Sequence, residues 1–222
     1  MNAAVIWQLV RKDLYLVRWM IVGSIIAGLV SIAMMPLGTV SAYVGGVSLI
    51  CVLIVLNIFL VMGGVVQERK DKVLLFVLSL PISTTEYTVA KVLANGITFT
   101  APWLILTLAN AVMINTSQIA DGLLPFWLTV LAYMFFYYCT LLAVSLVTDS
   151  TGWHTAAIIV GNVSVNFLIP VLLSRPSVAA HSKSQTAVWT LDIVTIIGVE
   201  VLAGLAALWL AVYFQSRRRD FV

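Results

Sequence analysis

The chain has 222 residues, of which 62% are hydrophobic and only 9% are charged. Soluble domains carry about 25% charged residues because their surface faces water, so this composition excludes an ordinary soluble domain. The formal net charge is +3, but the basic residues gather at the ends of apolar stretches, where such residues set topology and meet anionic lipid headgroups. The sequence has no basic stripe with interleaved aromatic residues, so it indicates no nucleic-acid partner.

The N-terminal segment, residues 1–18, is predicted to form an amphipathic helix at the membrane surface. On a helix with about 100° between residues, the polar face holds Gln8, Arg11, Lys12, Tyr15 and Arg18, and the apolar face holds Ile6, Val10, Leu14 and Val17. Asp13 is the exception, because it falls toward the apolar face. Two interpretations of Asp13 stay open: a carboxylate that is paired locally or reaches toward water, and a contact to a cytoplasmic loop or partner.

Six stretches are apolar over about 20 residues, the length that crosses a bilayer. They cover roughly residues 19–40, 42–67, 92–114, 122–148, 155–173 and 187–215. They predict an all-α membrane protein, with residues 1–222 forming one transmembrane domain. Gly45 and Gly46 are expected to let helices approach closely, and Trp103, Trp127 and Trp189 are expected in the aromatic belts at the membrane surfaces.

The orientation follows from the Lys and Arg residues beside these stretches. With the N-terminus inside, the inner segments hold Arg11, Lys12, Arg18, Arg69, Lys70, Lys72, Lys91, Arg217, Arg218 and Arg219, and the outer segments hold Arg175 and Lys183. This imbalance predicts a multi-pass protein of the cytoplasmic membrane with both termini in the cytoplasm. Residues 174–186 then form a polar outer loop.

Residues 67–91 form the most informative connection. Five charged residues at positions 68–72 are followed by an apolar block at 73–80, which is too short to span a bilayer. Pro81 stops this block because proline lacks a backbone donor, and Ser83 lies three residues before Glu86, the spacing of a helix capping box. The pattern predicts a helix, a turn and a new helix on the cytoplasmic face. It fits either a stable re-entry loop or a short helix that receives force from a soluble partner.

The sequences ERKDK, LSLPIS and EYTVAK in this connection resemble the ABC-2 type permeases of ATP-binding-cassette exporters. The N-terminal Arg11, Lys12 and Asp13 are similar to the interfacial helix of that group. The resemblance implies a coupling helix between spans two and three that contacts an ATPase. The coupling residues would be Glu68, Arg69, Lys70, Asp71, Lys72, Leu75, Leu78, Leu80, Pro81, Ser83, Glu86 and Lys91.

The resemblance also implies a half-transporter that pairs with a second permease, identical or similar, and exports a hydrophobic or amphipathic substrate such as a peptide, antimicrobial or lipid-like compound. The chain has no G-x-x-x-x-G-K-[ST] phosphate loop, so ATP and Mg²⁺ are expected on a separate ATPase, and no cofactor, metal or catalytic site is expected on this chain.

Polar residues inside the spans are candidates for the pathway, because a charge there costs at least ~2.5 kcal/mol unless it is paired or hydrated. These candidates are Asn57, Asn162, Asn166 and Glu200. Hydrogen bonding between helices is the structural alternative for the amides. Two other functions stay open: a secondary transporter driven by an ion gradient, and a membrane anchor for a cytosolic complex.

Overall fold

The computed structural model describes residues 3–67, 84–148 and 150–217, and this part of the chain is helical without any strand. The main helices are α1 (Ala3–Met34), α2 (Thr39–Val61), α5 (Thr84–Thr116), α6 (Leu124–Val147), α7 (Thr151–Ser174), α8 (Pro176–Ala179) and α9 (Leu191–Arg217). The short elements are η1 (Met35–Leu37), η2 (Met62–Val66) and η3 (Asp121–Leu123). The predicted all-α fold is confirmed. The predicted coupling helix at 73–80 lies outside the described residues.

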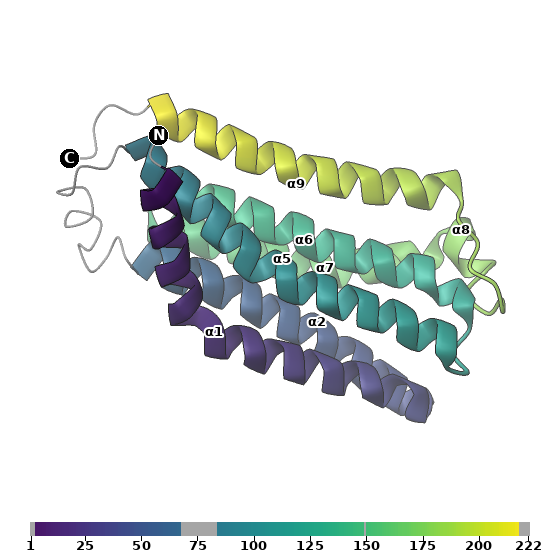
Figure 1. Ribbon diagram of the computed structural model, residues 1–222. Coiled ribbons are helices and arrows are strands. Elements are labelled where there is room, and N and C mark those ends of the chain that lie inside the picture. The colour runs from purple at the N-terminus through teal and green to yellow at the C-terminus, as the bar shows by residue number, and fades with distance from the viewer. Residues whose placement is uncertain (1–2, 68–83, 149, 218–222) are drawn as a thin grey trace.

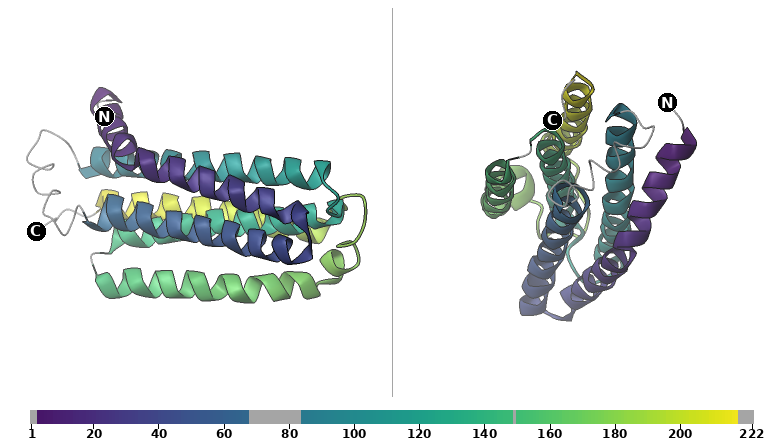
Figure 2. Two further views of the ribbon diagram at one scale, coloured as in Figure 1. Left: turned by 90° about the horizontal axis from the view of Figure 1, so that it is seen from below. Right: turned by 90° about the vertical axis from the view of Figure 1, so that its left-hand side faces the viewer.

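The long helices run side by side along one axis (Figures 1 and 2). The start of α1 and the end of α9 lie at one end of the bundle, here called the proximal end, and η1, η3 and α8 lie at the other, the distal end. Helix α6 is the centre of the bundle and packs against α5, α7 and α9, whereas α1 packs mainly against α2 and α5. Accordingly, α6 supplies several fully buried side chains, among them Leu131, Met134 and Leu142.

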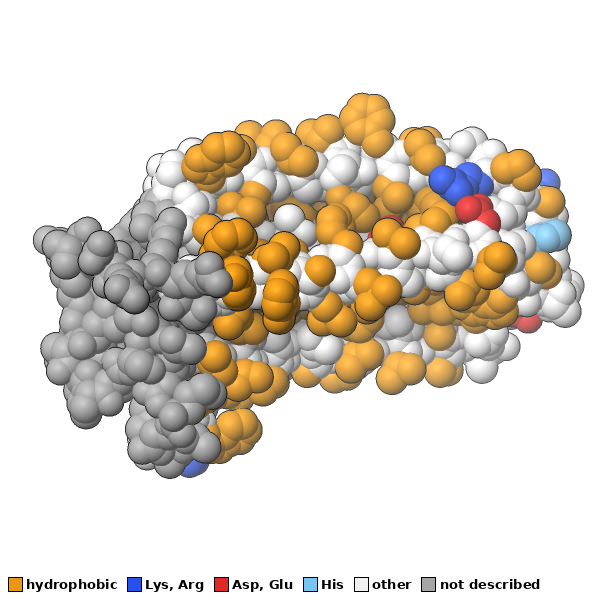
Figure 3. Space-filling model, turned by 90° about the horizontal axis from the view of Figure 1, so that it is seen from above, with side chains coloured by type: hydrophobic (Ala, Val, Ile, Leu, Met, Phe, Trp, Pro, Cys, Tyr) orange, Lys and Arg blue, Asp and Glu red, His pale blue; other side chains and the backbone are white. Residues whose placement is uncertain are grey.

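Six of the described helices are long and apolar enough to cross a membrane, at Ile6–Leu37, Thr39–Val66, Val89–Thr116, Asp121–Val147, Thr151–Ser174 and Leu191–Gln215. They correspond to the six predicted stretches. Large hydrophobic side chains are exposed along them, for example Phe167 on α7 and Leu202 on α9. Figure 3 shows a face that is hydrophobic along most of its length. Toward the distal end, Arg175 forms an ion pair with Asp192, with 2.8 Å between Nη1 and Oδ1.

Helix α1 differs from the predicted separation into a surface helix and a first span. Residues Ala3–Met34 form one continuous helix, and its first turns run at an angle to the rest (Figure 1). Ile6 and Val10 are buried against Ala90 and Ala94 of α5. The apolar face of the first turns therefore has a protein partner, and its location at a membrane surface stays a prediction.

Glycines in α2 allow close packing, as predicted. A Cβ on Gly45 would lie 2.5 Å from the carbonyl oxygen of Ser31 in α1, and a Cβ on Gly46 would lie 2.7 Å from the indole of Trp127 in α6. The prediction of a surface position is wrong for Trp103. Its Nε1 donates a hydrogen bond of 2.8 Å to the carbonyl oxygen of Leu131, because the middle of α5 packs against α6 inside the bundle.

Candidate coupling and pathway sites

An ion pair joins α1 to α5 at the proximal end of the bundle. Lys91 Nζ lies 2.6 Å from Asp13 Oδ2, although the two residues are 78 positions apart in the sequence. The Lys91 side chain is only 5% exposed and that of Asp13 only 14%. Lys12 lies beside the pair, 3.5 Å from Asp13 Oδ1. Asp13, the exception in the amphipathic pattern, therefore points toward the apolar face because its buried partner comes from α5.

Helix α2 ends in a turn of π-helix, η2, that supplies a second partner for Lys91. The backbone N–H of Gln67 donates to the carbonyl oxygen of Met62, five residues earlier. Lys91 Nζ donates a 3.1 Å hydrogen bond to the carbonyl oxygen of Gly64 in this turn. A Cβ on Gly64 would lie 3.3 Å from Asn95 Oδ1, so glycine lets α5 come close. Turns of π-helix are rare in proteins, but those that occur often lie at functional sites.

The contacts continue from α5 to α6. Asn95 Nδ2 donates to the carbonyl oxygen of Lys91 at 2.9 Å, and the Tyr138 hydroxyl donates to the carbonyl oxygen of Asn95 at 2.7 Å. Phe99 stacks on Tyr138 with 4.1 Å between ring centroids. We call Asp13, Gly64, Lys91, Asn95 and Tyr138 the proximal polar cluster. It joins α1, η2, α5 and α6.

The position of the proximal polar cluster matters for the connection at 67–91. Helix η2 ends at Val66 and α5 begins at Thr84, so the cluster ties together the two helices that flank that connection. A buried ion pair also resists separation, because removing one partner leaves an unpaired buried charge at a cost of about 3–5 kcal/mol. The cluster therefore holds α1, η2, α5 and α6 together at the proximal end.

Of the predicted coupling residues, Lys91 belongs to the cluster and Glu86 lies in the first turn of α5. Positions 68–83 lie outside the described residues. Arg11 and Lys12 are exposed on α1. Gly64, Asn95 and Tyr138 were not predicted as site residues. Asn95 alone carried a usable signal, since it lies one helical turn after Lys91 and shares its face.

A second polar group lies within the apolar part of the bundle. Glu200 on α9 shares a helix face with Gly204, where a Cβ would lie 3.3 Å from the Cα of Phe136 in α6. On α6, the Tyr133 hydroxyl forms a hydrogen bond with the Ser164 hydroxyl of α7. Glu200 Oε2 is buried, and no described residue forms a hydrogen bond with it. The Tyr133–Ser164 hydrogen bond thus connects α6 and α7, and Glu200 lies on α9, which packs against α6.

The three asparagine candidates do not gather at one place. Asn57 is fully buried in α2, and neither polar atom of its side chain has a hydrogen-bond partner among the described residues. On α7, Asn166 is exposed and its Nδ2 donates to the carbonyl oxygen of Asn162 at 2.9 Å. Their role in a pathway stays a prediction. Across the described ranges, no three His, Cys, Asp or Glu side chains could hold a metal ion together.

Comparison with known proteins identifies the family. No match was found among curated proteins or among solved structures. The family described as ABC-2 family transporter protein matches residues 8–215. This range contains the proximal polar cluster and nearly all of the six apolar helices. The chain therefore belongs to the ABC-2 transporter family and is a multi-pass transmembrane permease of an ABC-type transporter.

Proposed function

We propose that this chain is one half of an ATP-driven exporter of the cytoplasmic membrane, with both termini in the cytoplasm. A separate ATPase, which holds ATP and Mg²⁺, binds the connection at 67–91, and a second permease copy completes the pathway. The proximal polar cluster is the observation that carries this proposal, because it joins η2 and α5 on either side of that connection.

The cluster offers a physical route for coupling. A displacement of the connection moves the start of α5, and Lys91 transmits it to Asp13 on α1 and to the carbonyl oxygen of Gly64 in η2. The helices are rigid hydrogen-bonded rods, so movement of their proximal ends reorients them along their length. Coupling of this kind needs an element with two arrangements, and the π-helical turn beside Gly64 is the candidate.

The pathway is proposed to form between two copies, on the side where α7 and α9 leave apolar faces exposed. Glu200 and Ser164 supply polar atoms there, and the surrounding side chains are hydrophobic. This combination suits a hydrophobic or amphipathic substrate. Export, rather than import, is the direction proposed from the family resemblance of the connection.

The proposal is tested by co-expressing the chain with an ATP-binding-cassette ATPase encoded beside it and measuring ATP hydrolysis after reconstitution. Leu78→Asp and Leu80→Asp are expected to abolish permease-dependent hydrolysis while the protein stays in the membrane, because a charged side chain disrupts an apolar contact. Leu37→Asp is the control, since Leu37 is 75% exposed at the distal end.

Hydrolysis that stays at the wild-type rate in the Leu78 and Leu80 variants would contradict the docking assignment. Failure of any ATPase to bind the wild-type chain would contradict the exporter proposal as a whole. That second result would favour the ion-driven transporter, for which Glu200 supplies the intramembrane acid.

A further inference from the structure

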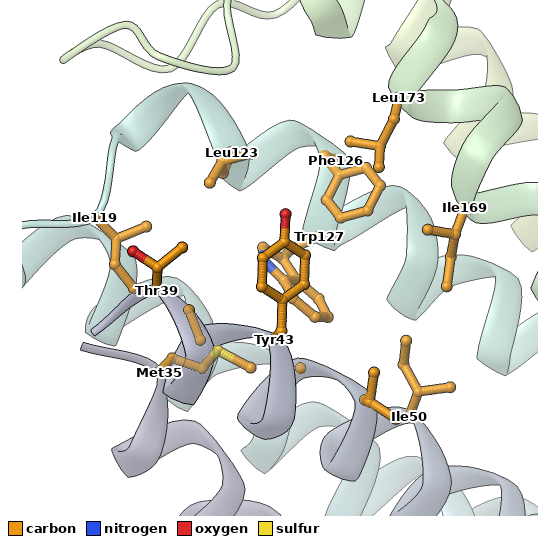
Figure 4. Close-up of a pocket in the computed structure, with 13 residues that line it drawn as sticks. Met35, Thr39, Tyr43, Ile50, Ile119, Leu123, Phe126, Trp127, Ile169 and Leu173 are labelled. Atoms are coloured by element: carbon orange, nitrogen blue, oxygen red, sulfur yellow. The ribbon is translucent and has the colours of Figure 1, made fainter. Parts of the chain in front are cut away.

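A cavity of about 350 Å³ lies at the distal end of the bundle, between α2, α6 and α7. Figure 4 shows side chains from all three helices pointing into it. It is separate from the proximal polar cluster and from Glu200, since none of those residues lines it. No part of the proposed coupling mechanism uses it.

The lining of the cavity is hydrophobic. Ile50, Phe126 and Leu173 come from three different helices, and none of the described residues that line it is charged. Among the described lining residues, Thr39 and Tyr43 carry side-chain hydroxyls. For scale, an enclosed apolar cavity of about 150 Å³ binds benzene. A volume more than twice as large has room for about ten or more carbon atoms on that scale.

Close packing between Gly46 and Trp127 shapes one wall of the cavity. The indole of Trp127 lies against Gly46, where a Cβ would be 2.7 Å from the ring. Glycine at this position lets the large Trp127 ring fold back against α2 and leaves the space beside it open. The cavity also opens sideways, because Tyr43 and Val47 line it and are 74% and 60% exposed.

The segment of α2 that lines the cavity is about as long as one leaflet of a bilayer is thick. Its lining on α2 extends from Thr39 to Ile50, which is about 16 Å at a rise of 1.5 Å per residue. The hydrocarbon core of a bilayer is about 30 Å thick, so the lining covers about half of it. Thr39 is the first residue of α2 and of the candidate span, so its hydroxyl lies at the end of the cavity farthest from the middle of that span.

We propose that this cavity binds one hydrocarbon chain of a membrane phospholipid, taken from the leaflet at the distal end. The chain lies along α2 with its tail toward Ile50 and its headgroup end near Thr39. The surroundings of a spanning helix at this depth are hydrocarbon, and no single side chain of a second protein copy reaches along such a length. This proposal does not depend on export or on an ATPase.

Bilayers of brominated phosphatidylcholine test the proposal, because bromine on an acyl chain quenches tryptophan fluorescence on contact. The full chain is reconstituted at low protein density in brominated and in ordinary phosphatidylcholine. In each bilayer, the tryptophan fluorescence of the wild type minus that of Trp127→Phe gives the fluorescence of Trp127 alone. We expect the Trp127 signal to fall by more than half in the brominated bilayer.

A filling variant separates the cavity from general contact with lipid. Ala42→Phe places a ring in the cavity, and Val40→Phe adds the same ring at a position that is 77% exposed and does not line it. Quenching of Trp127, measured against the same background with Trp127→Phe, should be lost in Ala42→Phe and retained in Val40→Phe. If Ala42→Phe fails to fold, Leu173→Phe fills the cavity from α7.

Three results would overturn the proposal. Equal Trp127 signals in the two bilayers would mean that no acyl chain enters. Quenching that persists in both filling variants would mean contact with bulk lipid only. The third result concerns protein density in the bilayer. If Trp127 is quenched only at densities too low for cross-linking to detect dimers, a second copy fills the cavity in the assembled protein.

Discussion

At the scale of single residues, the polar side chains inside the apolar helices are the informative ones, because each needs a partner that the bilayer does not supply. Lys91 pairs with the Asp13 carboxylate and donates to the Gly64 carbonyl oxygen. Glu200 Oε2, by contrast, is buried without a hydrogen bond from any described residue. The partners of Lys91 are typical of a contact that stabilises the fold. The Glu200 side chain, by contrast, has an oxygen atom that can accept a further hydrogen bond.

The ion pair predicts a specific pattern of stability. Asp13→Asn and Lys91→Gln should each lower the free energy of unfolding by about 3–5 kcal/mol, because each removes one partner of a buried ion pair. The double variant should be less destabilised than the sum of the two, since both charges are gone. Thermal unfolding in detergent measures all three. Lys12→Gln, at an exposed position, is the control and should change stability by less than about 1 kcal/mol.

Additive effects of the two single variants would mean that Asp13 and Lys91 do not interact. If Lys12→Gln lowers the free energy of unfolding as much as the two single variants do, the total charge of this region determines stability, and the Asp13–Lys91 ion pair does not. Either result would remove the ion pair from the coupling route.

A second prediction concerns close packing between α6 and α7. The Tyr137 ring lies where a Cβ on Gly161 would be, whereas a Cβ on Gly198 would meet no atom within 4 Å. Gly161→Ala should therefore destabilise the protein by about 1–3 kcal/mol through overpacking. Gly198→Ala, the same change on α9, should be neutral or stabilising because alanine favours helix. Comparable unfolding temperatures for the two variants would contradict the packing described here.

At the scale of elements, the end of α2 is the unusual feature. A π-helical turn holds one more residue than an α-helical turn, so it shifts the residues after it relative to those before it. Here that turn presents the Gly64 carbonyl oxygen to Lys91. The same turn directly precedes the connection at 67–91, and a change in its winding would rotate that connection relative to α2.

Deletion of Gly63 tests the role of this turn. The deletion should convert η2 to an α-helical turn and remove the widened turn that presents the Gly64 carbonyl oxygen to Lys91. ATP hydrolysis that depends on the permease should fall by about 5-fold or more, since coupling free energies are typically 1–3 kcal/mol. Gly63→Ala keeps the length, and its Cβ would meet no atom within 4 Å, so it should stay near wild type. Full coupling in the deletion variant would exclude η2 from the mechanism.

At the scale of the whole molecule, the arrangement around α6 leaves α7 and α9 mostly exposed, although both are apolar. Hydrocarbon or a second copy must cover such faces, because large exposed apolar surfaces are not stable in water. The two ends of the bundle differ as well. Residues 175–190 fold over the distal end, where the Gly122 amide donates to the carbonyl oxygen of Ser184 at 3.1 Å.

The proposed orientation gives a test of topology. In a background with Cys51→Ser and Cys139→Ala, Ser182→Cys should react with a membrane-impermeant maleimide applied to intact cells, because it lies beyond α8 at the distal end. Gln8→Cys, exposed near the start of α1, should react only after the cells are opened. The opposite labelling pattern would reverse the orientation and place the connection at 67–91 outside the cell, away from any ATPase.

The amino-acid sequence by itself determined the six helices, their approximate limits and the position of the longest charged connection. It could do so because a bilayer core demands about 20 apolar residues for each crossing and rejects charge between them. The same rule marked Asp13 and Glu200 as residues that need an explanation. Gly45 and Gly46 were also readable, since small residues permit close helix packing.

Only the tertiary structure decided which helices meet and through which residues. The spanning helices are apolar on nearly every side, so their sequences do not specify the face that turns inward. That is why the pairing of Asp13 with Lys91, the inward position of Trp103 and the cavity beside Trp127 were not predictable. Each depends on how two or three helices lie against one another, a contact that hydropathy along a single helix does not encode.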